Sequence, residues 1–164
     1  MNTSHTLQQL PAQWVTPENF RPYGQVIFPS TDHKPFDAED AQLNLQNGIP
    51  RFYIMRLEKI GRKFHQIARH VQCTQCLGSL SGKDWLIAVC PPNNDVKEPA
   101  LAEIAAFRIP GNCFIKLNEG TWHAGPYFEH DFVDFYNLEL ADTNIVDFST
   151  HDFLKSHQLE FEMV

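Results

Sequence analysis

The sequence predicts an all-β protein, and three observations lead to that class. Apolar runs of strand length recur along the chain, turn residues separate them, and segments with helical periodicity are scarce. The 164 residues fit one domain, 1–164, with a single core. Because the edges of short strands must be hidden, we expect a sandwich or a closed barrel of the jelly-roll type with one or two short helices.

The expected elements follow in chain order. Strand-like runs are YGQVIF, RFYIMRLE, KFHQIARH, QCLGSL, DWLIAVCP, IAAFRIP, CFIKL, FVDFYNLEL and LEFEMV. Residues 47–48, 81–84 and 110–112 carry Gly or Asn where a hairpin needs positive φ, so hairpins are expected there. Short helical pieces are expected at residues 16–21, where Thr16 precedes Pro17, and at 99–106. Residues 29–44 are polar and aperiodic, and are expected to form a surface loop.

Composition excludes several classes of protein. The chain has 13 Lys and Arg against 20 Asp and Glu, a net charge of -7, which argues against nucleic-acid or anionic-membrane partners. No signal-like start and no transmembrane-length run are present, so we expect a cytoplasmic location. The cysteines lie in apolar runs and are interpreted as buried thiols: Cys73, Cys76, Cys90 and Cys113.

Two stretches resemble the paired motifs of cupins. His70, Gln75 and Gly82 have the spacing of the first motif, although its Glu position is Gln75 and its earlier His position is Ala68. The segment from Gly111 through Gly120-Thr-Trp-His123 resembles the second motif. The resemblance implies a cupin-like β-barrel in which adjacent antiparallel strands bring His70, Gln75 and His123 to one concave wall.

Such a wall could hold a divalent metal ion through His70, Gln75 and His123. Two imidazoles and an amide carbonyl provide no carboxylate to offset the charge of the cation, so no cofactor is certain. The other interpretation is that both histidines only donate hydrogen bonds inside a polar cavity.

Further candidates flank these residues. Arg51, Arg69 and Lys116 lie on expected strands and could clamp a small carboxylate, or could be ordinary surface cations. Trp122 is expected to support His123 by packing at the mouth of the barrel. In the run DFVDFYNLEL, Tyr136 and Glu139 become acid or base candidates if the polar face points inward; a solvent-facing side is the alternative.

These residues together resemble the ureidoglycolate lyase family over residues 16–153. The resemblance rests on TPENFRPYG, on Arg69-His70 with Thr74-Gln75, on GTWH with Pro126, and on Asp134-Phe135. It implies a cytoplasmic homodimer that cleaves ureidoglycolate, a small carboxylate, into glyoxylate and urea during allantoin breakdown.

The resemblance also suggests roles for the candidates. His70 and His123 would be acid and base, because histidine titrates near neutrality, and Gln75 and Trp122 would contact substrate. Two departures stand out: Ala124-Gly125 precedes Pro126 where the family has His-Pro, and the family's Asp-Arg ending after Asp134-Phe135 is missing. Two alternatives stay open, namely another cupin enzyme acting on a small hydroxy or keto acid, and a non-catalytic cupin that binds a small acid.

Overall fold

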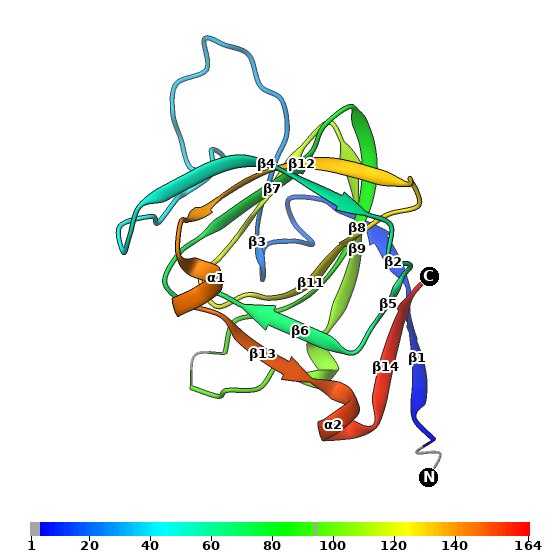
Figure 1. Ribbon diagram of the computed structural model, residues 1–164. Helices are drawn as coiled ribbons and strands as arrows, with labels where there is room; N and C mark the ends of the chain where they lie inside the picture. The colour runs from blue at the N-terminus through cyan, green and yellow to red at the C-terminus, as the bar shows by residue number, and fades with distance from the viewer. Residues whose placement is uncertain (1–3, 94) are drawn as a thin grey trace.

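The computed structural model describes residues 4–93 and 95–164, and most of its regular structure is β-strand (Figure 1). The five-stranded sheet has the order β3 (Gly24–Ile27), β10 (Phe114–Leu117), β7 (Gln75–Ser79), β12 (Phe132–Leu140) and β4 (Pro50–Glu58). The six-stranded sheet has the order β13 (Ser149–Asp152), β6 (Gln66–Arg69), β11 (Trp122–Tyr127), β8 (Gly82–Cys90), β9 (Ala105–Gly111) and β2 (Ala12–Trp14). A smaller sheet joins β1 (Thr6–Leu10), β14 (Leu159–Met163) and β5 (Lys63–Phe64). The all-β prediction is confirmed.

The two larger sheets enclose a central space. Figure 1 looks into it, with β4, β12 and β7 on one side and β6 and β13 on the other. Within the described residues, the backbone hydrogen bonds form separate sheets rather than one closed barrel. The cupin-like barrel therefore stays a prediction.

The expected turns are present, but none of the three closes a hairpin: no strand lies within residues 28–49 to pair across Asn47-Gly48, and the other two turns connect different sheets. Ser81 and Gly82 have φ values of 62° and 66°, as the sequence led us to expect. The chain leaves β7 in one sheet there and enters β8 in the other, and the turn after β9 likewise leads to β10 across the gap. Gly82 and Gly111 are paired so closely that a Cβ on Gly111 would collide with the backbone of Gly82. The hairpin prediction was wrong because these turns connect opposing sheets.

The helix predictions were right in part. Residues 17–23 form consecutive turns, with the side chains and backbone amides of Thr16 and Asn19 bonded reciprocally. Pro22 limits helix growth because it disfavours α geometry at the residue before it. Between residues 99 and 106 there is only a 3-10 turn, Leu101–Glu103, and β9 follows. Among the described residues the two α-helices are α1 (Thr143–Val146) and α2 (Phe153–His157), both in the C-terminal quarter.

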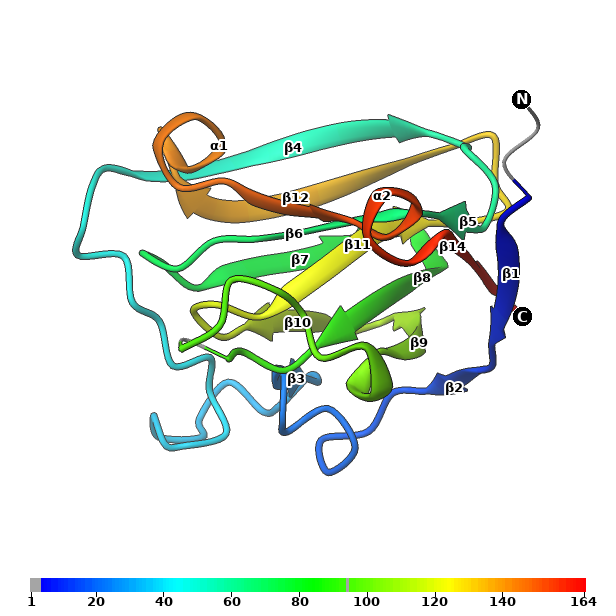
Figure 2. The ribbon, with the colours of Figure 1, turned by 90° about the horizontal axis from the view of Figure 1, so that it is seen from below.

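The hydrophobic core has two parts, one on each face of the six-stranded sheet. On β8, Trp85, Ile87 and Val89 belong to the part between the large sheets. The alternate residues Leu86, Ala88 and Cys90 belong to the part covered by β14 and α2 (Figure 2). Burial on both faces explains why this strand is an uninterrupted apolar run.

The remaining expectations concern the cysteines, the loop and the membrane. All four cysteines are buried free thiols, as predicted, and burial raises the pKa of Cys76 to about 12. Residues 28–49 contain no helix or strand, which confirms the loop. Its backbone is held by Gln25, whose amide donates to the carbonyls of Ala38 and Asp40. Among the described residues, no helix has the length and apolar character needed to cross a bilayer.

Candidate active site

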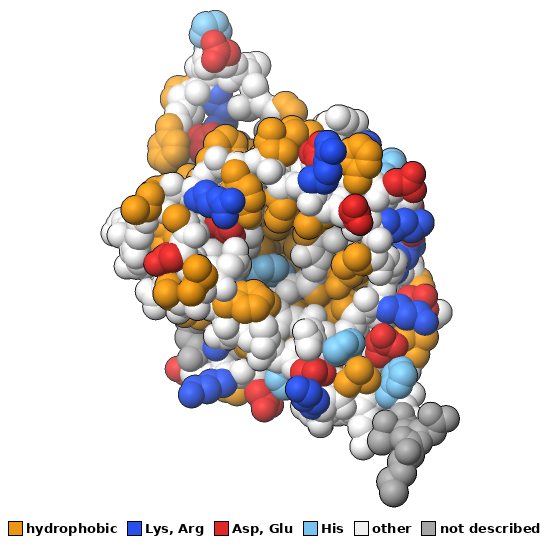
Figure 3. Space-filling view, viewed as in Figure 1, with side chains coloured by type: hydrophobic (Ala, Val, Ile, Leu, Met, Phe, Trp, Pro, Cys, Tyr) orange, Lys and Arg blue, Asp and Glu red, His pale blue; other side chains and the backbone are white. Residues whose placement is uncertain are grey.

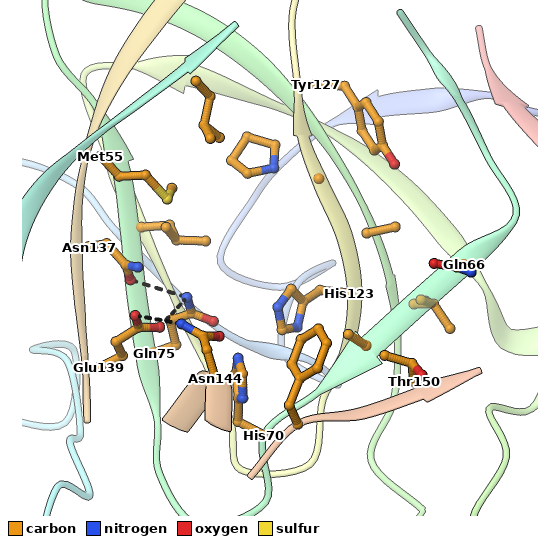
Figure 4. A pocket seen from close by; sticks show the side chains of 18 of the residues that line it. Met55, Gln66, His70, Gln75, His123, Tyr127, Asn137, Glu139, Asn144 and Thr150 are labelled. Atoms are coloured by element: carbon orange, nitrogen blue, oxygen red, sulfur yellow. Dashed lines mark hydrogen bonds between the residues drawn. The ribbon is translucent and has the colours of Figure 1, made fainter. Parts of the chain in front are cut away.

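A cavity of about 450 Å³ lies between the five- and six-stranded sheets. Figure 3 shows the hollow, with a histidine side chain at its floor and hydrophobic side chains around its rim. The polar side chains that line it come from both sheets and from α1: Tyr53, Gln66, His70, Gln75, His123, Tyr127, Asn137, Glu139, Asn144 and Thr150 (Figure 4). This cavity holds more of the predicted site than any other described part of the chain.

His70 and His123 face each other in this cavity, with ring centroids 5.6 Å apart. Nδ1 of His70 donates to the carbonyl of Asp147 at 2.6 Å, and Nδ1 of His123 donates to the carbonyl of Thr121 at 3.2 Å. In the neutral ring this leaves Nε2 of each histidine as a free acceptor. Desolvation, reinforced by His70, lowers the pKa of His123 to about 4. His123 is therefore neutral at pH 7, and its Nε2 is open to accept a proton.

Asp147 fixes the segment that carries His70. Its carboxylate accepts hydrogen bonds from the backbone amides of Val71 at 2.9 Å and Gln72 at 2.8 Å, and its own carbonyl receives the His70 proton. These contacts join the stretch after α1 to the turn between β6 and β7. Sequence reasoning missed Asp147, because nothing local in the sequence links it to residues 70–72.

Glu139 is buried at the side of the cavity formed by the five-stranded sheet. Its carboxylate accepts hydrogen bonds from Tyr53 at 3.2 Å, from Asn144 at 3.1 Å and from Gln75 at 3.2 Å. Gln75 also donates to Asn137 at 3.1 Å, and Asn137 donates to the hydroxyl of Tyr53 at 3.1 Å. These contacts give each of the five side chains a defined orientation toward the cavity.

Gln75 and the two histidines do not share one wall, contrary to expectation. His123 is paired with Ala68 across β11 and β6, in the six-stranded sheet, and His70 follows β6 directly. Gln75 begins β7 in the opposite sheet. The three residues still line the same cavity, because the connection from β6 to β7 crosses between the sheets.

Arg69 and Trp122 lie on the other face of the six-stranded sheet. Trp122 is 0% exposed and belongs to the core part beneath the C-terminal segment. The Arg69 guanidinium stacks 4.4 Å from its ring and donates to the carbonyls of Asn93 and Val96. Because strand neighbours point to opposite faces, Trp122 must point away from the cavity when His123 points into it.

Lys116 and Tyr136 lie outside the cavity as well. Lys116 is buried, and its Nζ donates a hydrogen bond to the side-chain oxygen of Asn118 at 2.6 Å. Desolvation lowers the pKa of Lys116. Tyr136 packs against Phe114 on the outer face of the five-stranded sheet. Tyr136 and Glu139 are three residues apart on one strand, an odd spacing that puts them on opposite faces. The expectation that both could point into the barrel was therefore wrong.

Arg51 has an intermediate position. Its guanidinium lies 3.6 Å from the centroid of the Tyr53 ring, and Tyr53 lines the cavity. The side chain of Arg51 itself is exposed. Of the three cations predicted to clamp a carboxylate, Arg51 is the one whose side chain packs on a residue that lines the cavity.

Sequence reasoning also missed Tyr53, Asn137 and Asn144. Tyr53 and Asn137 had a usable signal, since they alternate with apolar residues in phase with Met55 and Glu139. Asn144 had none, because α1 was not predicted.

The donor set fits a divalent metal ion poorly. Among the residues that the structure describes, no three His, Cys, Asp or Glu side chains are grouped so that they could hold an ion. The two histidines would need Gln75 as a third ligand, and that set is neutral. Both oxygens of Glu139 already accept hydrogen bonds.

Comparison with known proteins was made by family and by individual sequence. A family model described as ureidoglycolate lyase matches residues 7–157. A search of curated proteins found no match.

Proposed function

The chain belongs to the ureidoglycolate lyase family, which makes it a lyase, and we propose that it splits ureidoglycolate into glyoxylate and urea. The match over residues 7–157 carries this proposal and agrees with the resemblance found in the sequence. The cleaved bond joins carbon to a urea nitrogen, so the enzyme would be a carbon–nitrogen lyase of the amidine-lyase type, acting in allantoin and purine breakdown.

The reaction needs one proton removed and one delivered. A base takes the proton of the substrate hydroxyl, the oxygen electron pair forms the carbonyl of glyoxylate, and the C–N bond breaks with its pair going to nitrogen. That nitrogen then receives a proton and leaves as urea. The atoms balance without water, an oxidant or a metal ion.

His123 is the base that we propose. Its pKa of about 4 keeps Nε2 unprotonated at neutral pH, and Nδ1–H is held by the carbonyl of Thr121. His70 lies opposite, at 5.6 Å between ring centroids. Its Nε2, an acceptor in the resting neutral ring, would take up the proton that His123 removed and deliver it to the leaving nitrogen, so that both rings end neutral. Glu139 would orient substrate through the side chains that it holds.

A coupled assay tests the proposal. Purified protein is mixed with ureidoglycolate, and glyoxylate is followed through an NADH-dependent reductase, with urea measured separately. Equal amounts of both products, formed faster than by spontaneous decay, are expected. A rate no higher than that of buffer would reject the lyase and favour binding, or action on another small hydroxy or keto acid.

A metal-assisted reaction is the second candidate, because Nε2 of His70, Nε2 of His123 and Oε1 of Gln75 have no hydrogen bond from the described residues. Since this neutral set fits a divalent ion poorly, we derive no step through a metal. Dialysis against EDTA should leave turnover unchanged. Lost activity that returns with one divalent metal would favour the second candidate.

We further propose a cytoplasmic homodimer with a cupin-like jelly roll. The orders β4-β12-β7-β10 and β6-β11-β8-β9 fit an eight-strand double sheet. Phe52 and Ile54 are 71% and 64% exposed on β4, an edge strand that offers apolar surface to a second copy. Sedimentation at micromolar concentration should give twice the chain mass. Phe52→Glu should shift the mass toward that of one chain.

A further inference from the structure

The amide of Gln75 is locked in one orientation. Its Nε2 donates to Oδ1 of Asn137 at 3.1 Å and to Oε2 of Glu139 at 3.2 Å, and both partners are acceptors at those atoms. The reverse orientation would set Oε1 against these two oxygens. The network therefore determines that Oε1 is the atom left over.

That leftover oxygen is buried and has no partner. Gln75 is 8% exposed, it lines the cavity, and its Oε1 accepts no hydrogen bond from the described residues. A buried acceptor without a donor is unfavourable, so such an atom points to a ligand that donates.

The histidines present the same character. In each ring Nδ1–H donates a hydrogen bond to a backbone carbonyl, so Nε2 of neutral His70 and of neutral His123 is an acceptor. Figure 4 shows the side chains of Gln75, His70 and His123 around one space. Three acceptors, namely two imidazole nitrogens and one amide oxygen, thus border the same part of the cavity.

The cavity offers no matching site for an anion. None of the described residues that line it is Lys or Arg, and its one carboxylate, Glu139, is buried there. A substrate carboxylate in this part of the cavity would meet acceptors and a second carboxylate without a cation.

We propose that this acceptor-lined part of the cavity binds the ureido end of the substrate, with a terminal N–H donating to Oε1 of Gln75 and the carboxylate directed out of this part of the cavity. This inference rests on the proposed function, since ureidoglycolate is the donor-rich ligand considered. Its ureido group carries three N–H bonds, and its hydroxyl adds a fourth donor for a histidine. Gln75 is then a residue that selects substrates with a terminal amide.

Calorimetric binding of two stable ligands tests this without turnover. N-carbamoylglycine keeps the ureido group and the carboxylate but lacks the hydroxyl, so it cannot undergo the elimination. N-acetylglycine has the same shape with a methyl group in place of the terminal NH2. The wild-type protein should bind N-carbamoylglycine about tenfold more tightly or better.

Variants then assign the preference to Gln75. In Gln75→Leu the ratio of the two affinities should fall to about one, whereas Gln13→Leu, an exposed control on β2, should keep the wild-type ratio. Equal affinities in the wild-type protein would overturn the proposal even if Gln75→Leu does not fold. A preference that survives in folded Gln75→Leu would overturn it too.

The outcome is separable from that of the lyase assay. Ureido-selective binding without glyoxylate release would reject the proposed reaction and keep the role of Gln75. Glyoxylate release without ureido selectivity would keep the proposed reaction and reject the role of Gln75.

Discussion

His70 follows the C-terminal end of β6 and His123 lies near the N-terminal end of β11, two ends that the antiparallel pairing brings together, and their rings lie 5.6 Å apart at an angle of 47°. Each ring is fixed by one backbone carbonyl at Nδ1. The pair therefore presents two oriented Nε2 atoms to one small molecule, which is the arrangement that proton removal and delivery require.

Substitution of neighbouring residues on β11 should separate chemistry from packing. His123→Ala should lower kcat by about 100- to 10,000-fold with little change in the unfolding free energy. Trp122→Ala should cost about 3–5 kcal/mol, because the indole is fully buried against Arg69. Urea unfolding and kcat per folded molecule check both. An early-melting His123→Ala that keeps its activity would show that the imidazole is structural.

Protonation of His123 should make stability fall in mild acid. Burial lowers its folded pKa to about 4 from the usual value of 6.5, so between these values the unfolded chain binds a proton that the native protein does not. Stability from this group is complete above pH 6.5 and falls by about 3 kcal/mol as the pH drops to 4. The difference between wild type and His123→Gln, measured by urea unfolding at pH 7.5 and 4.5, isolates the effect. Parallel pH dependences would contradict it.

Two β12 residues should differ sharply in their effect on turnover. Glu139→Gln should lower kcat/KM by at least about tenfold, because the carboxylate that orders Tyr53, Gln75 and Asn144 is lost. Tyr136→Phe should leave kcat and KM unchanged, since this ring packs on the outer face. Steady-state kinetics of both variants test the assignment. Comparable losses would mean that the outer face contributes to catalysis.

Loss of the Asp147 carboxylate should disturb His70 indirectly. Asp147→Ala leaves the amides of Val71 and Gln72 without their acceptor and should cost about 1–3 kcal/mol, whereas Asp147→Asn retains one acceptor oxygen and should cost less. Because His70 directly precedes the two amides that Asp147 holds, its ring should lose its fixed orientation, and kcat should fall more than KM rises. A change confined to melting temperature would limit Asp147 to a structural role.

The three predicted cations should not contribute equally to substrate binding. Arg51→Met should raise KM about tenfold if the guanidinium beside Tyr53 meets the substrate carboxylate. Lys116→Met should not change KM, since this amine is bonded to Asn118 outside the cavity. The reverse pattern in Michaelis kinetics would mean that substrate binds at another place.

The sequence by itself determined the strand composition, the family and four residues of the cavity. Period-2 alternation and turn residues predicted the all-β class, because they are local consequences of backbone geometry. The motif spacing identified His70, Gln75 and His123, although it did not predict that β7 would lie in the opposite sheet. Glu139 was also found. Tyr136 was grouped with it, although two residues three positions apart on a strand point to opposite faces.

Only the tertiary structure decided which side chains meet. Trp122, Arg69 and Lys116 are close to the histidines in sequence or in pattern, and they point away, because strand neighbours alternate between faces. Asn144 lines the cavity from a short helix, and Asp147 in the stretch after it binds His70; both lack a strong local signal. Contacts between segments distant in the chain depend on how the two sheets stack, and that stacking is set by burial of the whole core rather than by local sequence.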